Sequence, residues 1–514
     1  MTELRRIVDN VHEQQHNGMS TGCVIDEQLK TIIIKWSRRA TFAGLMWATV
    51  LASASFAAGN HHVYTVQVDE SLDRLHVTAH FAAPVTYIAA RSNSAEQFLL
   101  GAQDCDSGER IETAGRRMAT PDAGISCLSY VIDLRKAAKA ERRNRSLAPD
   151  NIIVSPIVWM WRPRLGRRDD VRVQFLLPDA VQVSVPWRPI ESTAHTYVLT
   201  ASPQSGSATA IFGRFDAAVT NVAGSDLRIA LLRSSTDYDT AAMVDWIRDT
   251  ANNITLVYGR FPNPAARIII IPVATSPWRR DLPGVVFGRI VRDGGETVEL
   301  LIDPRQPVES YHSDWTATHE LSHMMLPYLR GEQRWISEGF AQYYQNVLLT
   351  RAGRYDEQYA WQKLHDGLER GRTSVPEMSP NEATGADERN SRMKVYWSGT
   401  ALALLADIEL RGRSNGKKSL DTVLGQFQRC CLPSVRTWTG TELFTKFDSF
   451  LDEPLFMNLY RQFADTPGFP DTNPLLGQLG IVLDDGKVRL SDAAELAEIR
   501  AALMARIYTG APGR

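Results

Sequence analysis

Hydrophobic and polar residues alternate in short runs along the part of the chain that follows residue 60. A period of two is typical of β-strands that bury one face. The alternation is clearest in four runs, Val63–Val68, His76–Phe81, Val171–Phe175 and Val181–Val185. Turns that contain Pro and Gly separate such runs, so the pattern predicts a β-sandwich-like domain over residues 59–235.

From residue 236 the pattern changes to helical spacing interrupted by short apolar strands. Asp237–Thr250 has the spacing of an amphipathic helix, whereas Ala266–Ile271 and Thr297–Ile302 are short, nearly continuous apolar runs. We therefore expect a small sheet followed by paired helices over residues 236–412, and a helical region over residues 413–514. The expected fold class is α+β with several domains.

The size and charge of the chain narrow the classes of function. A chain of 514 residues that is 44% hydrophobic is long enough for two to four domains with sizeable cores. The formal net charge of −2 gives no overall attraction to nucleic acid or to anionic membranes. Nucleic-acid motifs and basic stripes with interleaved aromatic residues are missing from the sequence, so we expect no nucleic-acid partner.

The amino terminus has the pattern of an export signal. A positive flank over residues 35–39 precedes the apolar run Ala40–Ala54, and small residues follow at Ala57 and Ala58. The run is short and weakly hydrophobic for a membrane-spanning helix. We expect residues 1–58 to be a leader with a signal peptide cleaved near Ala57 or Ala58, which places the protein in the periplasm or outside the cell. The alternative is an uncleaved anchor.

Cysteine usage is compatible with export. Removing the leader leaves Cys105, Cys127, Cys430 and Cys431. Cys105 and Cys127 flank a loop of the β-rich domain and could pair in an oxidising compartment, or remain two partly buried thiols. A disulfide between the neighbours Cys430 and Cys431 would be strained, so we interpret these two as packing residues.

The pentapeptide H-E-L-S-H is the strongest chemical signal in the sequence. On a helix, His319 and His323 lie on one face and can hold one metal ion, while Glu320 is placed to take a proton from a water on that metal. Asp314 offers a helix cap before the motif and Pro327 should stop the helix after it. The alternative is a helix with two ordinary histidines.

Two further residues are candidates for the same site. Glu338 lies in the first turn of a second apolar-striped helix, where it could be the third ligand that catalytic zinc requires, or a carboxylate that complements the helix dipole. Tyr396 begins an Ala- and Leu-rich helix, where it could donate a hydrogen bond to an oxyanion, or be an interfacial aromatic residue.

Three stretches of the chain together resemble the glycyl aminopeptidase family of zinc metallopeptidases: H-E-L-S-H, W-I-S-E-G-F-A-Q-Y-Y-Q-N-V-L-L-T-R-A-G, and V-Y-W-S-G-T-A-L-A-L-L-A-D-I-E-L-R-G-R-S-N-G-K-K-S-L-D. That family belongs to the gluzincins, and the resemblance implies a thermolysin-like catalytic domain. It also implies that His319, His323 and Glu338 bind one Zn2+ per chain, that Glu320 is the general base, and that Tyr396 steadies the oxyanion.

The chain departs from the family pattern in three ways. Only 14 residues separate His323 from Glu338, a shorter connection than is usual. A family strand carries a glutamate that binds the amino terminus of the substrate, but the comparable stretch P-G-V-V-F-G-R has no acid; Glu296 or Glu299 could substitute. The PDZ domain that ends many relatives is not recognisable in the sequence.

The sequence therefore predicts an exported zinc metallopeptidase that hydrolyses peptide bonds with metal-activated water, as an aminopeptidase. The alternatives are a zinc endopeptidase without recognition of the amino terminus, and a non-catalytic envelope protein that binds peptides on the same fold. The intact general base at Glu320 argues against the non-catalytic alternative. The expected partner is a peptide or protein substrate, and the sequence sets no oligomeric state.

Overall fold

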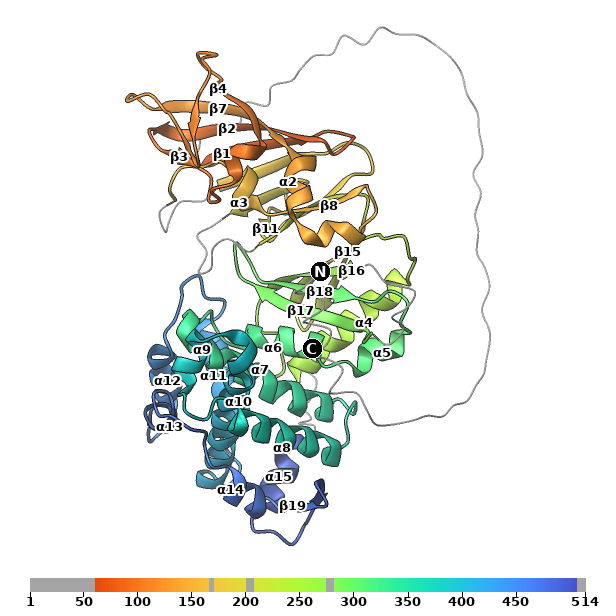
Figure 1. Ribbon diagram of the computed structural model, residues 1–514, viewed down its shortest axis with the longest axis vertical. Coiled ribbons are helices and arrows are strands. Elements are labelled where there is room, and N and C mark those ends of the chain that lie inside the picture. The colour runs from red at the N-terminus through yellow and green to blue at the C-terminus, as the bar shows by residue number, and fades with distance from the viewer. Residues whose placement is uncertain (1–60, 166–170, 200–207, 274–281, 506–514) are drawn as a thin grey trace, which may run out of the picture. The chain divides into compact units, whose positions relative to one another are not determined.

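The computed structural model describes residues 61–165, 171–199, 208–273 and 282–505 (Figure 1). The predicted leader lies outside these residues. Within them, every helix is too short or too polar to cross a membrane. The expected fold class, α+β with an N-terminal sheet-rich part followed by helices, is confirmed.

The N-terminal part is built on a seven-stranded sheet in the order β11-β12-β9-β1-β2-β7-β4. All of its neighbours pair antiparallel except β1 and β9. Two three-stranded sheets, β10-β13-β8 and β3-β6-β5, accompany it. The strands are β1 (His62–Val68), β2 (Arg74–Val85), β3 (Ile88–Ala89), β4 (Leu99–Asp104), β5 (Thr113–Ala114), β6 (Arg117–Met118), β7 (Ile125–Asp133), β8 (Asn151–Val154), β9 (Val171–Leu176), β10 (Gln182–Ser184), β11 (Arg188–Pro189), β12 (Thr196–Leu199) and β13 (Ala210–Gly213).

Short helical turns connect some of these strands: η2 (Ala95–Phe98), α2 (Leu134–Ala140), η3 (Arg142–Ser146) and α3 (Pro156–Trp159). The predicted alternation is visible in β1, where Tyr64, Val66 and Val68 are buried in the core. The alternating pattern therefore identified strands such as β1, β2 and β9, because each of these buries one of its two faces.

A second, five-stranded sheet follows in the order β14-β15-β16-β18-β17. Its strands are β14 (Asp216–Val222), β15 (Ser225–Leu231), β16 (Ala265–Pro272), β17 (Val285–Val291) and β18 (Thr297–Ile302). The three middle strands are parallel, and β14 and β17 are antiparallel edges. By sequence, β14 and β15 fall in the expected domain 59–235, but their hydrogen bonds place them in this second sheet.

The middle strand of the second sheet is buried on both faces. Ile268 and Ile270 of β16 pack into the core that contains α4 (Thr240–Thr255), while Ile269 and Ile271 pack into a smaller core on the other face. This is why the run appears nearly continuously apolar in the sequence rather than alternating.

The described part of the chain from residue 308 to residue 505 is largely helical, with the hairpin β19–β20 before the last helix (Figure 1). Its elements are α5 (Val308–Ser313), α6 (Thr316–Ser322), η4 (His323–Met325), η5 (Gly331–Gln333), α7 (Arg334–Arg351), α8 (Glu357–Thr373), α9 (Pro380–Gly385), α10 (Glu388–Arg413), α11 (Leu420–Cys431), α12 (Gly440–Asp448), α13 (Phe456–Phe463), α14 (Asn473–Gln478), β19 (Ile481–Asp484), β20 (Lys487–Leu490) and α15 (Ala497–Met504).

Helices α7 and α10 approach each other closely at a pair of glycines. A Cβ atom on Gly339 would lie 2.2 Å from the Cα atom of Gly399, and the hydroxyl of Thr400 donates to the carbonyl of Gly339 at 3.2 Å. Only glycine allows backbones to come this near. Glu338 is the residue before Gly339 in α7, and Tyr396 lies one turn before Gly399 in α10. The glycine contact therefore lies next to both residues.

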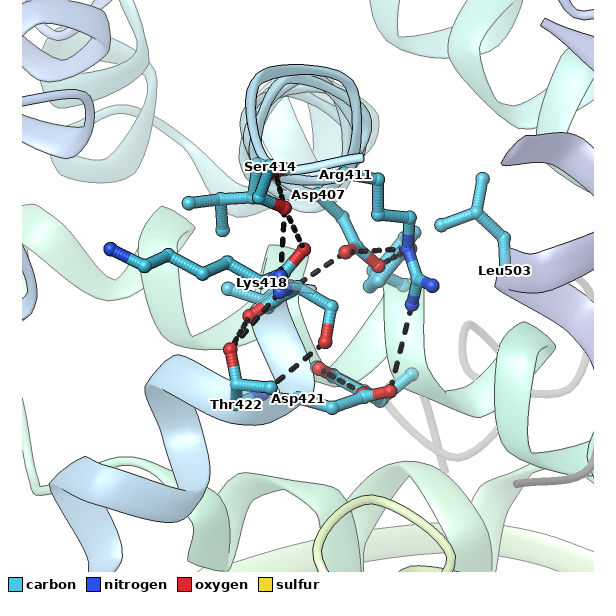
Figure 2. A network of polar contacts seen from close by, with 12 residues as sticks. Asp407, Arg411, Ser414, Lys418, Asp421, Thr422 and Leu503 are labelled. Carbon is cyan, nitrogen blue, oxygen red and sulfur yellow. Dashed lines mark hydrogen bonds and ion pairs between the residues drawn. The ribbon is translucent and has the colours of Figure 1, made fainter. Parts of the chain in front are cut away.

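A buried polar network fixes α7 from its far end (Figure 2). The hydroxyl of Tyr343 donates to Asp407 and that of Tyr344 donates to Asp421, each at 2.8 Å. Arg351, at the end of α7, pairs with the same Asp421 at 2.9 Å. The Y-Y…R stretch and the S-L-D stretch that carry the family resemblance are therefore in direct contact.

The network also connects the neighbouring helices. Arg411 donates to Asp407 at 3.0 Å, and the backbone N–H of Leu420, at the start of α11, donates to Asp407 at 2.9 Å. The guanidinium of Arg351 donates to the carbonyl of Leu503 in α15. Helices α7, α10, α11 and α15 are thus joined by ionic and charge-assisted hydrogen bonds that burial strengthens.

The part of the chain that the structure describes contains two disulfides. Cys105 pairs with Cys127, which was one of the two possibilities left open by the sequence. Cys430 pairs with Cys431, so the expectation that strain prevents this disulfide was wrong, whereas Cys431 packs against the main core as expected. Cys430 is exposed at the end of α11, so its side chain has no packed surface to fill.

Candidate metal centre

Helix α6 is short and almost entirely buried. The N-cap position is Trp315 rather than the predicted Asp314, but the carboxylate of Asp314 accepts the first N–H of the helix, that of Thr316, at 2.7 Å. The helix tightens into η4 from His323 and ends at Leu326, before Pro327. His319 and His323 therefore occupy one face, one turn apart, with their ring centroids 4.9 Å from each other.

The structure brings the three predicted ligands together. His319, His323 and Glu338 each offer one ligand atom, and these atoms lie within 4.8 Å of one another. The Oε2 atom of Glu338 is 3.3 Å from Nε2 of His319 and 3.5 Å from Nε2 of His323. The short connection from His323 to Glu338 is therefore long enough to bring α7 back to α6.

The separations fit a zinc ion. Zinc holds nitrogen and carboxylate oxygen at about 2.0–2.1 Å in tetrahedral geometry, which separates neighbouring ligand atoms by about 3.3 Å. The two nitrogen–oxygen distances at Glu338 are close to that value. Two imidazoles and one carboxylate also form a donor set of catalytic zinc sites, which leave a fourth position open.

The same helix that supplies Glu338 also orients both histidines. The Nδ1 atom of His319 lies 3.1 Å from Oε1 of Gln345, and that of His323 lies 2.9 Å from Oγ of Ser337. With Nδ1 so engaged, each ring turns its Nε2 atom toward Glu338. Sequence reasoning missed Gln345, although its place seven residues after Glu338 puts it on the same helical face.

The charges of the cluster complement one another. Burial lowers the pKa of His319, but its hydrogen bond to Glu338 and the nearby charge of Glu320 outweigh burial and raise that pKa. Burial raises the pKa of Glu338, but the charge of His323 and the hydrogen bonds from both rings outweigh it and lower that pKa. Glu338 is therefore held as a carboxylate, the form that binds metal.

Glu320 lies beside the cluster rather than in it. Burial raises its pKa above the usual range, against the lowering effect of both histidines and of a hydrogen bond from the N–H of Ile290. A Cβ atom on Gly288 would lie only 2.7 Å from Cγ of Glu320, so edge strand β17 runs directly over this side chain. The strand both contacts Glu320 and limits its movement.

Tyr396 packs against His319, one of the three candidate ligands. The two rings stack with centroids 5.8 Å apart and an angle of 19° between their planes. Burial, followed by the charges of Glu338 and Glu320, raises the pKa of Tyr396 well above its usual value. Its hydroxyl therefore stays protonated and can donate a hydrogen bond.

Neither acid that we considered for binding an amino terminus is free. Glu299 is fully buried, accepts from Thr209 at 2.9 Å and pairs with Arg143 and Arg289. Glu296 accepts from Arg292 at 2.9 Å. Arg292, which follows β17, also donates to the backbone carbonyl of His323. This bond connects the end of β17 to η4, directly after α6.

Comparisons with known proteins agree with this geometry. Residues 316–401 match the family model described as M61 glycyl aminopeptidase. Among solved structures, an aminopeptidase N family protein from Idiomarina loihiensis is similar with a TM-score of 0.61 and 14% identity, over 84% of this chain and 82% of that one. An M1 zinc metallopeptidase from Deinococcus radiodurans gives a TM-score of 0.48 and 14% identity, over 80% of this chain and 94% of that one. None of the curated proteins matches the chain.

The family match covers all five predicted site residues, from His319 to Tyr396. It confirms the predicted resemblance to the glycyl aminopeptidases and the predicted class of enzyme. The likeness to the Idiomarina structure, at low identity, supports the fold alone.

Proposed function

We propose that this zinc metallopeptidase hydrolyses peptide bonds by general-base catalysis at one zinc ion per chain, held by His319, His323 and Glu338. The convergence of these three residues from α6, η4 and α7, with their ligand atoms within 4.8 Å of one another, is the observation that carries the proposal. A zinc ion held there would supply Lewis acidity, which lowers the pKa of a water and polarises the scissile carbonyl.

Glu320 is the proton carrier in this proposal. Its raised pKa makes the carboxylate a better proton acceptor than an exposed glutamate, and its position beside the ligands places it near the attacking water. The proton that it accepts there is given to the leaving amine. The N–H of Ile290 and the close passage of Gly288 hold the carboxylate in place for both transfers.

Tyr396 is the proposed donor to the oxyanion. It remains protonated, is half-buried and stacks on His319, so its hydroxyl is placed close to the metal ligands. A hydrogen bond that strengthens as negative charge develops on the carbonyl oxygen lowers the barrier. Replacing Tyr396 with Phe should therefore lower kcat more than it raises KM.

Strand β17 is the proposed substrate platform. It is the last strand of its sheet and passes over Glu320, so an extended peptide could add to its free edge beside the catalytic base. We propose an aminopeptidase, in line with the family match. An endopeptidase is the second candidate, because Glu296 and Glu299 are both engaged with arginines.

We also propose that the protein acts after export. The two disulfides support this, because disulfides form and persist in oxidising compartments.

Metal analysis and one substitution test the mechanism. The purified protein should contain one zinc ion per chain, and Glu320→Gln should keep the zinc and lose hydrolysis. If the wild type binds no zinc near neutral pH, or if Glu320→Gln cleaves peptides as fast as the wild type, the proposal fails.

A pair of substrates separates the two peptidase candidates. An aminopeptidase should cleave a peptide with a free amino terminus and leave its N-acetylated form intact. Equal rates on the two peptides would instead identify an endopeptidase.

A further inference from the structure

The disulfide between Cys430 and Cys431 stands at an exposed helix end that is connected to the metal centre. The two residues are the last of α11, Cys430 is exposed and Cys431 is partly buried. Exposed disulfides are open to attack by an incoming thiolate, since exchange needs access to a sulfur atom. Neither cysteine has a role in the proposed peptide hydrolysis.

The segment that leaves this helix end, residues 432–440, folds back on the connection between the two ligand helices. The N–H of Trp438 donates to the carbonyl of Tyr328 at 2.8 Å, and the N–H of Arg330 donates to the carbonyl of Trp438 at 3.0 Å. The N–H of Gly440 donates to Oε1 of Gln333 at 2.6 Å. Three hydrogen bonds thus hold residues 328–333 against residues 438–440.

Residues 328–333 are part of the backbone connection between His323 and Glu338. This connection runs from η4, through Leu326–Arg330 and η5, to the first turn of α7. A looser hold on this connection would allow Glu338 to move relative to the two histidines, because the position of a ligand depends on the helix that carries it.

Side chains connect the disulfide to the same segment. Phe427 lies three residues before Cys430, and its ring meets that of Trp438 edge to face with centroids 5.4 Å apart. The Sγ atom of Cys430 is 3.4 Å from the carbonyl oxygen of Phe427. In the disulfide this sulfur carries no proton, whereas a thiol could donate to that carbonyl. The last turn of α11 therefore has different bonds in the two oxidation states.

We propose that Cys430 and Cys431 form a redox site that takes a dithiol as reductant, and that reduction loosens the connection between the metal ligands. A thiolate of the dithiol attacks Sγ of Cys430, the bond between the two cysteines breaks, and Cys431 leaves as a thiolate that takes up a proton. The second thiolate of the donor then displaces Cys430, which is protonated in turn. The donor ends as a disulfide and the pair ends as two thiols.

Amide hydrogen exchange tests the coupling without reference to zinc. The wild type and the double variant Cys430→Ser/Cys431→Ser are compared in the full chain, each with and without a phosphine reductant. In the oxidised wild type the amides of Arg330, Trp438 and Gly440 should exchange slowly. Reduction should speed their exchange about tenfold, as expected for a locally opened segment. The serine variant should exchange fast in both conditions.

The serine variant also controls for the second disulfide, since both proteins retain Cys105–Cys127. A response of the variant to the reductant, or equal exchange in oxidised and reduced wild type, would overturn the proposal. Alkylation followed by peptide mapping reports whether the pair was reduced; a pair that resists the phosphine also overturns it.

The consequence for the metal rests on the proposed function. In zinc-loaded protein, the reduced wild type should release zinc to a chelator several-fold faster than the oxidised form, and the serine variant should match the reduced form. A protein that binds no zinc but shows the exchange difference would contradict the proposed function and support the redox site. A redox-independent zinc release from loaded protein would overturn the proposed link to the metal and leave the peptidase proposal standing.

Discussion

The proposed metal site depends on side chains other than its three candidate ligands. Gln345 presents a neutral amide oxygen to Nδ1 of His319, which can accept a hydrogen bond from Nδ1 and so leaves Nε2, on the side of Glu338, as the nitrogen that would bind a metal. A carboxylate at this position would add charge as well as orientation. The neutral amide therefore supplies orientation alone, and its contribution can be measured through the affinity for zinc.

Replacing Gln345 with Met should weaken zinc binding by about 10- to 100-fold, the usual effect of losing an outer partner of a ligating histidine. Competition with a chromogenic chelator measures this affinity. Gln342→Met is the matched control, since Gln342 is buried on the same helix and, among the described residues, its side chain forms no hydrogen bond with His319, His323 or Glu338. Gln345→Glu keeps an acceptor oxygen and should restore most of the affinity; equal binding by all three variants would contradict the role.

Gly288 limits the space around Glu320, the proposed general base. A methyl group there would lie 2.6 Å from Cγ2 of Thr316 and 2.7 Å from Cγ of Glu320, so strand β17 or Glu320 must shift. Because a shift of about 1 Å at a reacting group can cost 10²-fold in rate, Gly288→Ala should lower kcat/KM by about that factor and retain zinc. Gly331→Ala, at a glycine with open space beside it, should leave both unchanged.

At the scale of elements, α7 is positioned from both ends. Its first turn meets α6 at the ligands and α10 at Gly399, while Tyr344 and Arg351 anchor its second half to Asp421. Gln345 lies between the anchors Tyr344 and Arg351, whereas Glu338 lies in the first turn, so the polar network in Figure 2 fixes the part of α7 that follows Glu338.

Breaking that network should be costly. Asp421→Ala leaves Arg351 buried without its main partner and should lower the free energy of unfolding by about 3–5 kcal/mol. Tyr344→Phe removes one hydrogen bond to a charged group and should cost about 2 kcal/mol. Asp452→Ala breaks the neighbouring exposed pair with Lys418 and should change nothing measurable. Denaturant unfolding compares the three, and a loss for Asp421→Ala no larger than for Asp452→Ala would contradict the anchoring role.

The sequence predicted best those elements that are determined by residues close together in the chain. The spacing of His319 and His323, the hydrogen bond of Asp314 to the first turn and the stop at Pro327 all act within one or two helical turns. The network at Asp421 joins residues 70 or more positions apart, as Tyr344 and Arg351 show, and no periodic pattern encodes such a pairing. The same reason explains why the sequence pattern grouped β14 and β15 with the preceding strands. The pairing of β15 with β16 joins residues that are about 40 positions apart, and local alternation does not encode it.

At the scale of the whole chain, the free energy of unfolding should depend on pH because Asp314 has a raised pKa in the folded state. Burial raises the pKa of this carboxyl from 3.8 to about 6, and hydrogen bonds from the N–H groups of Thr316 and Val285 only partly oppose it. Between these two pKa values the folded state holds a proton that the unfolded state has lost, so stability falls as the pH rises from about 4 to about 6 and then levels off.

Asp314→Asn should remove this fall, because the amide keeps an acceptor oxygen for Thr316 and never ionises. At pH 4 the variant and the wild type should unfold at nearly equal denaturant concentrations. At pH 7 the variant should be more stable by about 2–3 kcal/mol, which is the free energy equivalent of the shifted pKa. Asp179→Asn, at an exposed aspartate, is the control for loss of a negative charge and should follow the wild type at both values. A variant whose stability differs from that of the wild type by the same amount at pH 4 and pH 7 would show that Asp314 is ionised without penalty. Asp314, before the ligand helix, would then carry a full charge beside β17, and the burial of this helix would be less complete than its contacts indicate.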